Sequence, residues 1–241
     1  MKVTVYIEDK IKRLPRGYVF TYEWFDIDVR KKQALIKALN RMVDAKKLSK
    51  LSKGRYFKPE TTPFGNLQPS QEQVVKDLLY NNGKIVGYFT GYSIYNKLGL
   101  TSQVSNSIQI GKNEIRPEFK RERYTISFVK QKNVITKKNI PLLQILDAIR
   151  YIKKIPDTTI EISCLRLLEI IKSLNDDNKK DLVRLSLKYP PSTRALLGAL
   201  LEELQEGSIT EILRKSLNSI TQYKIPEVTK VLTKSSGWNI V

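Results

Sequence analysis

The apolar residues between positions 29 and 46 recur at the spacing of an amphipathic helix. Asp28 precedes them and is a suitable N-cap, so the pattern predicts a helix from Val29 to about Lys46. One face of this helix is expected to lie in a core. Its apolar residues are Leu35, Ala38, Leu39 and Met42.

Two shorter helices are predicted before it. Residues 2–13 offer Val5, Ile7 and Ile11 for burial, and the sequence LPRG at 14–17 ends this helix, since a residue before proline disfavours helical backbone. A short helix over residues 22–25 would begin after Thr21 as its N-cap.

A β-hairpin is predicted directly after the long helix. Residues 48–51 alternate in polarity, Gly54 supplies a turn, and residues 55–58 return. Three helices followed by a basic hairpin are the layout of a winged helix-turn-helix. We therefore expect a winged-helix domain over residues 1–60 and a linker over 61–69, where proline and glycine interrupt regular structure.

The remainder, residues 70–241, is predicted to be a larger α/β domain that ends in a helical bundle, which makes the fold class α+β. Its α/β part spans about 70–135, with a helix at 70–80 begun by a Ser70/Gln73 capping box. Its helical part spans about 140–220. Strands are expected at 85–90, 107–110 and 124–129, and helices at 141–154, 162–174, 179–188, 193–204 and 209–217.

The charge of the chain bears on its function as well as on its fold. Lys and Arg number 43 against 24 Asp and Glu, a net charge of +19. The excess is confined to the first two thirds: residues 155–241 hold 12 basic and 11 acidic residues. Such an excess is typical of nucleic-acid binding, because cations neutralise phosphates and release counterions. The alternative is a basic but otherwise inert surface.

Other function classes find little support in the sequence. The chain has no histidine, the commonest general base and zinc ligand, and we predict no catalytic site, metal or cofactor. Gly83, Gly87 and Gly91 match no phosphate-binding motif. Cys164 has no partner for a disulfide. With no apolar run of membrane-spanning length, we expect a cytoplasmic protein that is not an enzyme.

The helix face opposite the apolar residues carries side chains of the types that proteins use to bind DNA. Arg, Gln and Asn read base edges, and Lys and Arg hold phosphates. Arg30, Gln33 and Lys37 are the expected base readers, since a recognition helix reads with its N-terminal part. A solvated helix surface is the alternative. The full set of predicted DNA-binding residues is Arg30, Lys31, Lys32, Gln33, Lys37, Asn40, Arg41 and, on the hairpin, Lys50, Lys53 and Arg55.

Several segments, in this order, resemble the AbiEi family of antitoxins from type IV toxin–antitoxin (abortive infection) systems. The winged-helix part is matched by LPRGYVFTYEWFDI, ALIKALNRMV and LSKLSKGRYFKPE. The second domain is matched by GYFTGYSIYNKLGLTSQVSNSIQIG and PLLQILDAIRYIKKIPD. The resemblance covers about residues 10–160.

The resemblance implies a bacterial transcriptional regulator that binds inverted repeats in its own promoter and represses the operon. It also implies a cognate nucleotidyltransferase-like toxin, counteracted directly or indirectly through the C-terminal domain. The recognition-helix match covers residues 30–41 and the wing match 50–58. Many members begin this helix with Ser/Thr-Arg, whereas this chain has Asp28-Val29-Arg30, which leaves the operator sequence open.

Two further surfaces and two further functions stay open. A second basic surface is expected on the helix 141–154 and on a loop that carries Lys112, Arg116, Lys120, Arg121 and Arg123. The alternatives in function are a stand-alone winged-helix regulator without a toxin and an RNA-binding module. The sequence does not fix the oligomeric state.

Overall fold

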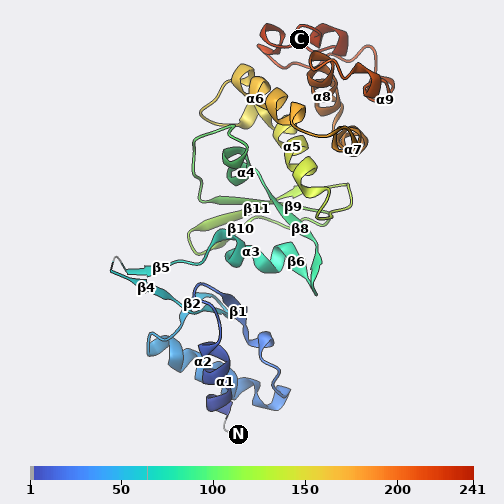
Figure 1. Ribbon diagram of the computed structural model, residues 1–241. Coiled ribbons are helices and arrows are strands. Elements are labelled where there is room, and N and C mark those ends of the chain that lie inside the picture. Colours follow the sequence, from blue (N-terminus) through green and yellow to red (C-terminus); the bar gives the residue numbers. More distant parts are fainter. Residues whose placement is uncertain (1–2, 64) are drawn as a thin grey trace. The chain divides into compact units, whose positions relative to one another are not determined.

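The chain combines helices and small β-sheets in two compact units. The computed structural model describes residues 3–63 and 65–241. One unit comprises Met1–Asp77 and Lys120–Tyr124, and the other comprises Leu78–Phe119 and Thr125–Val241. Figure 1 gives the elements, which confirm a mixed α+β class. The domain limits at residues 60 and 70 stay a prediction, since compactness alone does not delimit a functional domain.

The first unit begins with helices and a three-stranded antiparallel sheet in the order β1-β3-β2. The first and third predicted helices and the hairpin are confirmed, although α2 begins at Lys32 because the three preceding residues form a 3-10 turn. The short helix predicted over residues 22–25 is a 3-10 turn, and its N-cap Thr21 makes no side-chain hydrogen bond to it. Asp28 caps this turn by accepting from the Arg30 amide at 2.9 Å. The elements are α1 (Val3–Lys12), β1 (Val19–Thr21), η1 (Tyr22–Trp24), η2 (Val29–Lys31), α2 (Lys32–Asp44), β2 (Ser49–Ser52) and β3 (Arg55–Phe57).

The core of the first unit lies between α1, α2 and the sheet. The predicted apolar face of α2 is buried, at Leu35, Ala38, Leu39 and Met42. From α1 come Ile7 and Ile11, one helical turn apart. The prediction for Val5 was wrong: its side chain is 51% exposed, because two residues of helix turn it to the face opposite Ile7.

The predicted linker contains a small hairpin. β4 (Glu60–Thr62) pairs with β5 (Gly65–Leu67), so the stretch is not free of regular structure. α3 (Gln71–Leu79) follows, with the Ser70 hydroxyl accepting from the Gln73 amide at 3.3 Å. The Gln73 side chain does not complete the capping box. Its Oε1 accepts from the Val19 amide at 3.2 Å instead, which attaches α3 to β1.

In the second unit, β9 (Ser107–Lys112) lies between β8 (Gly87–Thr90), which is antiparallel to it, and β11 (Tyr124–Lys130), which is parallel. The three predicted strands are thereby confirmed. The predicted basic loop contains one more strand, β10 (Phe119–Arg121), and the sheet order is β10-β11-β9-β8. The remaining short elements are β6 (Tyr80–Asn81), β7 (Lys84–Ile85) and α4 (Tyr92–Lys97).

α-Helices follow the sheet over residues 140–215, in agreement with the predicted helical part over about 140–220, and 3-10 turns follow them (Figure 1). α5 contacts β8, α7 and α8, and α8 is the most enclosed helix, with buried residues on every side. Within the described residues, no helix is both long and apolar enough to cross a membrane. The helices are α5 (Ile140–Arg150), α6 (Ile160–Lys172), α7 (Asp176–Ser186), α8 (Pro191–Glu203) and α9 (Glu211–Lys215), with 3-10 turns η3 (Ile152–Lys154), η4 (Gly207–Ile209), η5 (Val228–Lys230) and η6 (Ser235–Trp238).

Candidate nucleic-acid interface

The outer face of α2 presents a row of three polar side chains. Gln33, Lys37 and Arg41 are exposed and follow one another at helical spacing, opposite the buried Leu35 and Leu39. Among the described residues, none of these three side chains has a hydrogen-bond or ion-pair partner. Their donors and charges are therefore available to a ligand, and burying the opposite face fixes the direction in which they point.

The turn before α2 holds two more of the predicted residues in defined positions. The Arg30 guanidinium donates to both carboxylate oxygens of Asp28, with the shortest contact at 2.9 Å. These hydrogen bonds lower the pKa of Asp28 and raise that of Arg30. The Arg30 side chain is still 90% exposed, so Asp28 orients it without covering it. Lys31 is exposed, and its charge also lowers the pKa of Asp28.

Tyr22, which the sequence did not single out, lies between α2 and the hairpin turn. The Lys32 Nζ lies 4.3 Å from the centre of its ring, a cation–π contact. A Cβ atom at Gly54, in the turn of the hairpin, would lie 3.7 Å from the same ring. Tyr22 thus holds the start of α2 close to the hairpin turn. In the sequence, the position of Tyr22 between the basic segments at residues 10–16 and 30–32 is the signal that could have indicated this role.

The hairpin contributes two free cations and one that is engaged. Lys50 and Lys53 are exposed and have no ion-pair partner among the described residues. Arg55 forms an ion pair with Asp77 at 2.6 Å and is only 27% exposed. On α2, the Asn40 side-chain oxygen accepts from the hydroxyl of buried Tyr56 at 3.2 Å, which ties the helix to β3. Structural contacts therefore occupy Arg55 and one end of Asn40.

Arg121, predicted for the second basic surface, lies inside the first unit. Its guanidinium donates to Asp77 at 2.7 Å and to the Val74 carbonyl, and its side chain is only 4% exposed. Burial alone would raise the pKa of Asp77, but the bonds and charges of Arg121 and Arg55 outweigh burial and lower it. Asp77 therefore binds both arginines, and Arg121 is not part of an exposed surface because it anchors residues 120–124 to α3.

The other residues of the predicted second basic surface divide between the two units. Lys120 and Arg123 belong to the first unit, and Lys112 and Arg116 to the second. The Arg116 guanidinium lies over the rings of Phe119 and Phe128, at 4.3 and 5.5 Å, and Arg123 donates to the Tyr124 hydroxyl at 2.8 Å. These residues do not form one continuous surface within either unit.

Catalytic chemistry has few candidate groups in the part of the chain that the structure describes. No three or more His, Cys, Asp or Glu side chains there are placed to hold a metal ion. Cys164 is fully buried, and burial raises the pKa of its thiol to about 12. A thiol in that state is a poor nucleophile.

Comparison with known proteins gives a family and a fold. No curated protein matches the chain. Among solved structures, the crystal structure of the RV2827C protein from Mycobacterium tuberculosis is similar, with a TM-score of 0.59 and 13% sequence identity. The alignment covers 90% of this chain and 82% of that one, and at this identity it supports the fold alone. The model of DUF6088, a family of unknown function, matches residues 6–182, and the chain therefore belongs to that family.

Proposed function

We propose that the first unit is a winged helix-turn-helix domain that binds double-stranded DNA. α2 would be the recognition helix and the β2–β3 hairpin the wing. One observation carries this proposal: Gln33, Lys37 and Arg41 form an exposed row without intramolecular partners, beside a hairpin with free lysines. A helix of this kind fits the major groove, where side chains reach the base edges.

The residues divide by chemistry into base readers and phosphate binders. Gln33 matches the N6 and N7 atoms of adenine, and Arg30 and Arg41 match guanine. Lys31 and Lys53 suit phosphates, which fix the register of the protein on the duplex but carry no sequence information. Asp28 restricts Arg30 to one orientation, which lowers the entropy lost when this side chain binds a base.

We propose further that the protein is a bacterial antitoxin of the AbiEi type. It would repress its own operon at inverted repeats in the promoter and counteract a nucleotidyltransferase-like toxin through its C-terminal part, in the cytoplasm. The family resemblance of residues 10–160 and the basic first two thirds of the chain support this role. A stand-alone regulator would bind the same DNA but would not protect cells that express the toxin from a neighbouring gene.

A charge-matched pair of double variants tests the DNA-binding face. Lys37→Gln/Arg41→Gln removes two charges from α2, and Lys172→Gln/Lys180→Gln removes two from exposed positions on α6 and α7. With a labelled duplex from the upstream region, fluorescence anisotropy should show a loss of affinity of at least about tenfold for the α2 variant. The control should stay within about twofold. Equal losses in both variants would refute the proposed face.

A further inference from the structure

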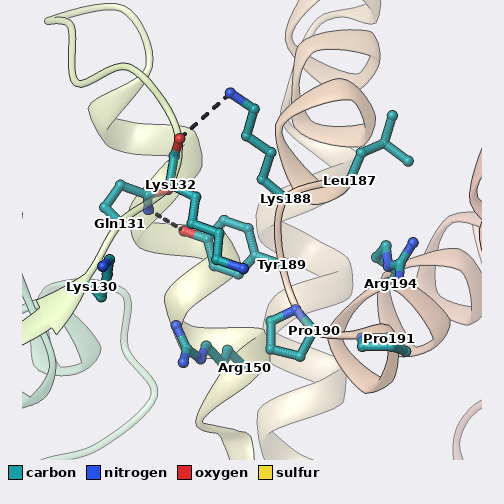
Figure 2. Close-up of a pocket in the computed structure, with 10 residues that line it drawn as sticks. All are labelled: Lys130, Gln131, Lys132, Arg150, Leu187, Lys188, Tyr189, Pro190, Pro191 and Arg194. Carbon is teal, nitrogen blue, oxygen red and sulfur yellow. Dashed lines mark hydrogen bonds between the residues drawn. The ribbon is translucent and has the colours of Figure 1, made fainter. Parts of the chain in front are cut away.

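A basic pocket lies in the second unit, whereas the proposed recognition helix belongs to the first. It has a volume of about 660 Å³, within the range of small-molecule sites. Its lining comes from the end of β11, from α5, from the segment between α7 and α8, and from the start of α8, as Figure 2 shows. Five of the ten lining residues are cationic: Lys130, Lys132, Arg150, Lys188 and Arg194.

None of these five cations forms an ion pair with a carboxylate among the described residues, and no acidic residue lines the pocket. The Lys188 ammonium donates only to the Lys132 carbonyl, at 3.5 Å, and Arg194 donates to the Ser216 carbonyl at 2.9 Å. The Nε of Arg194 is buried without a partner. Like charges around one hollow repel each other, so an anion that enters gains attraction from several cations at once.

Gln131 and Tyr189 form the floor of the pocket, and the hydrogen bonds of their side chains lead into the interior of the second unit. Gln131 donates to the hydroxyls of Tyr88 and Tyr189 at 2.8 Å, and its oxygen accepts from Asn133. Tyr189 in turn donates to the buried carboxylate of Asp147 at 2.9 Å. Because this network satisfies the floor internally, recognition falls to the cations on the walls. A compact, densely charged anion matches such a pocket better than a neutral metabolite.

The start of α8 adds a further attraction for anions. Pro190 and Pro191 line the pocket where this 13-residue helix begins, and no side chain caps its N-terminus. The positive end of the helix dipole therefore lies at the edge of the same hollow. A nucleic-acid backbone would require cations in a row along its path, whereas these cations come from four separate segments and surround a concavity.

We infer that this pocket binds a small anion with two or more phosphate groups, such as a pyrophosphate, a tripolyphosphate or a nucleoside polyphosphate. The inference does not depend on the proposed DNA binding, because the pocket and α2 belong to different units.

Calorimetric titration of the full chain with tripolyphosphate tests this inference, at about 0.15 M salt to screen diffuse charge. One saturable site is expected. Lys132→Gln/Lys188→Gln should weaken it at least about tenfold, since both cations line the pocket, and Lys172→Gln/Lys180→Gln should change it less than about twofold. All four lysines are exposed, and circular dichroism checks that each variant is folded. Lys130→Gln/Arg150→Gln serves as a second pocket variant.

Three results would overturn the inference. The first is the absence of a saturable site in the wild type. The second is equal weakening by the pocket variants and the control, which would assign the affinity to general surface charge. The third is tighter binding of a single-stranded RNA with the same number of phosphates, lost in the pocket variants, which would assign the pocket to nucleic acid. Lys132→Gln/Lys188→Gln should bind the upstream duplex as tightly as the wild type does, so a failure of the anion site can be told apart from a failure of the recognition helix.

Discussion

The buried carboxylate of Asp147 holds β8 and the segment before α8 against α5. Its Oδ2 accepts from the hydroxyls of Tyr88 and Thr90, both at 2.8 Å, and its Oδ1 accepts from the hydroxyl of Tyr189 at 2.9 Å. The side chain of Asp147 is fully buried. Removing the carboxylate should therefore destabilise the second unit by an amount that follows from the groups it leaves unpaired.

Asp147→Ala removes the acceptor from all three hydroxyls. Tyr189 retains an alternative in the Leu143 carbonyl at 3.3 Å, whereas the described residues offer Thr90 no other acceptor and leave Tyr88 the hydrogen bonds that it forms with Gln131 and Tyr189. A buried O–H donor that loses its charged acceptor costs about 1–3 kcal/mol, so the donors of Tyr88 and Thr90 together cost about 4 kcal/mol. Asp147→Asn retains one oxygen for Tyr88 and Thr90 and should cost about 1 kcal/mol.

The assay is urea denaturation followed by the fluorescence of Trp238 in a Trp24→Phe background. The chain has two tryptophans, one in each unit, and Trp238 is buried in the second unit. Its signal therefore reports the unit that contains Asp147. A difference of about 3 kcal/mol between the two variants corresponds to a difference of at least about 1 M in urea midpoint.

The order of the two variants is the decisive result. If Asp147→Ala were as stable as Asp147→Asn, the hydroxyls would have found other partners and the carboxylate would not be the acceptor that orders this network. A changed m-value would instead show that the native or the denatured state had altered. The comparison would then use Tyr88→Phe, which removes one hydroxyl donor to the carboxylate and leaves both carboxylate oxygens in place.

Three further predictions concern the second unit. Burial raises the pKa of Asp147 above its ordinary value of 3.8, so the folded state binds more protons than the unfolded state. The free energy of unfolding of the wild type should therefore fall relative to that of Asp147→Asn as the pH rises from 4 toward the raised pKa. Gly198→Ala should destabilise the unit by about 1–3 kcal/mol in thermal unfolding, because its Cβ would lie 2.3 Å from the Trp238 ring. Cys164 should not react with a thiol reagent at pH 8 until the protein is denatured, since its thiol is buried.

Each of these has a result that contradicts it. If the free energies of unfolding of the wild type and Asp147→Asn changed in parallel with pH, the Asp147 carboxyl would have the same pKa in the folded and the unfolded state. A Gly198→Ala protein as stable as the wild type would show that the indole can move aside. Stoichiometric labelling of native Cys164 would show that α6 opens readily.

Local patterns in the sequence were enough to predict most helices and strands. The buried face of α2 repeats every three to four residues, and Gly54 marks the turn of the hairpin, with φ of +75°. Both signals lie within a few residues of the elements that they define. Val5 and the hairpin at residues 60–67 were missed, since a short helix allows several buried faces and glycine and proline also occur in hairpin turns.

The side-chain partners could not be predicted, because they come from distant parts of the chain. Arg121 binds Asp77 across 44 residues, and Arg55 binds it across 22. From the sequence alone, both arginines would be taken for unpaired surface cations. The basic pocket likewise joins residues from 130 to 194 that share no local motif. Only the three-dimensional structure shows which cations carboxylates neutralise and which remain available.

One measurement tests the central claim most directly. The wild type and Gln33→Ala are titrated against a duplex from the upstream region and against a scrambled duplex, each at two salt concentrations. If α2 reads bases, the wild type should prefer the upstream duplex at both salts, and Gln33→Ala should lose about 1–3 kcal/mol on that duplex alone. Equal, salt-sensitive binding of both proteins to both duplexes would contradict base reading by α2 and leave only attraction by charge.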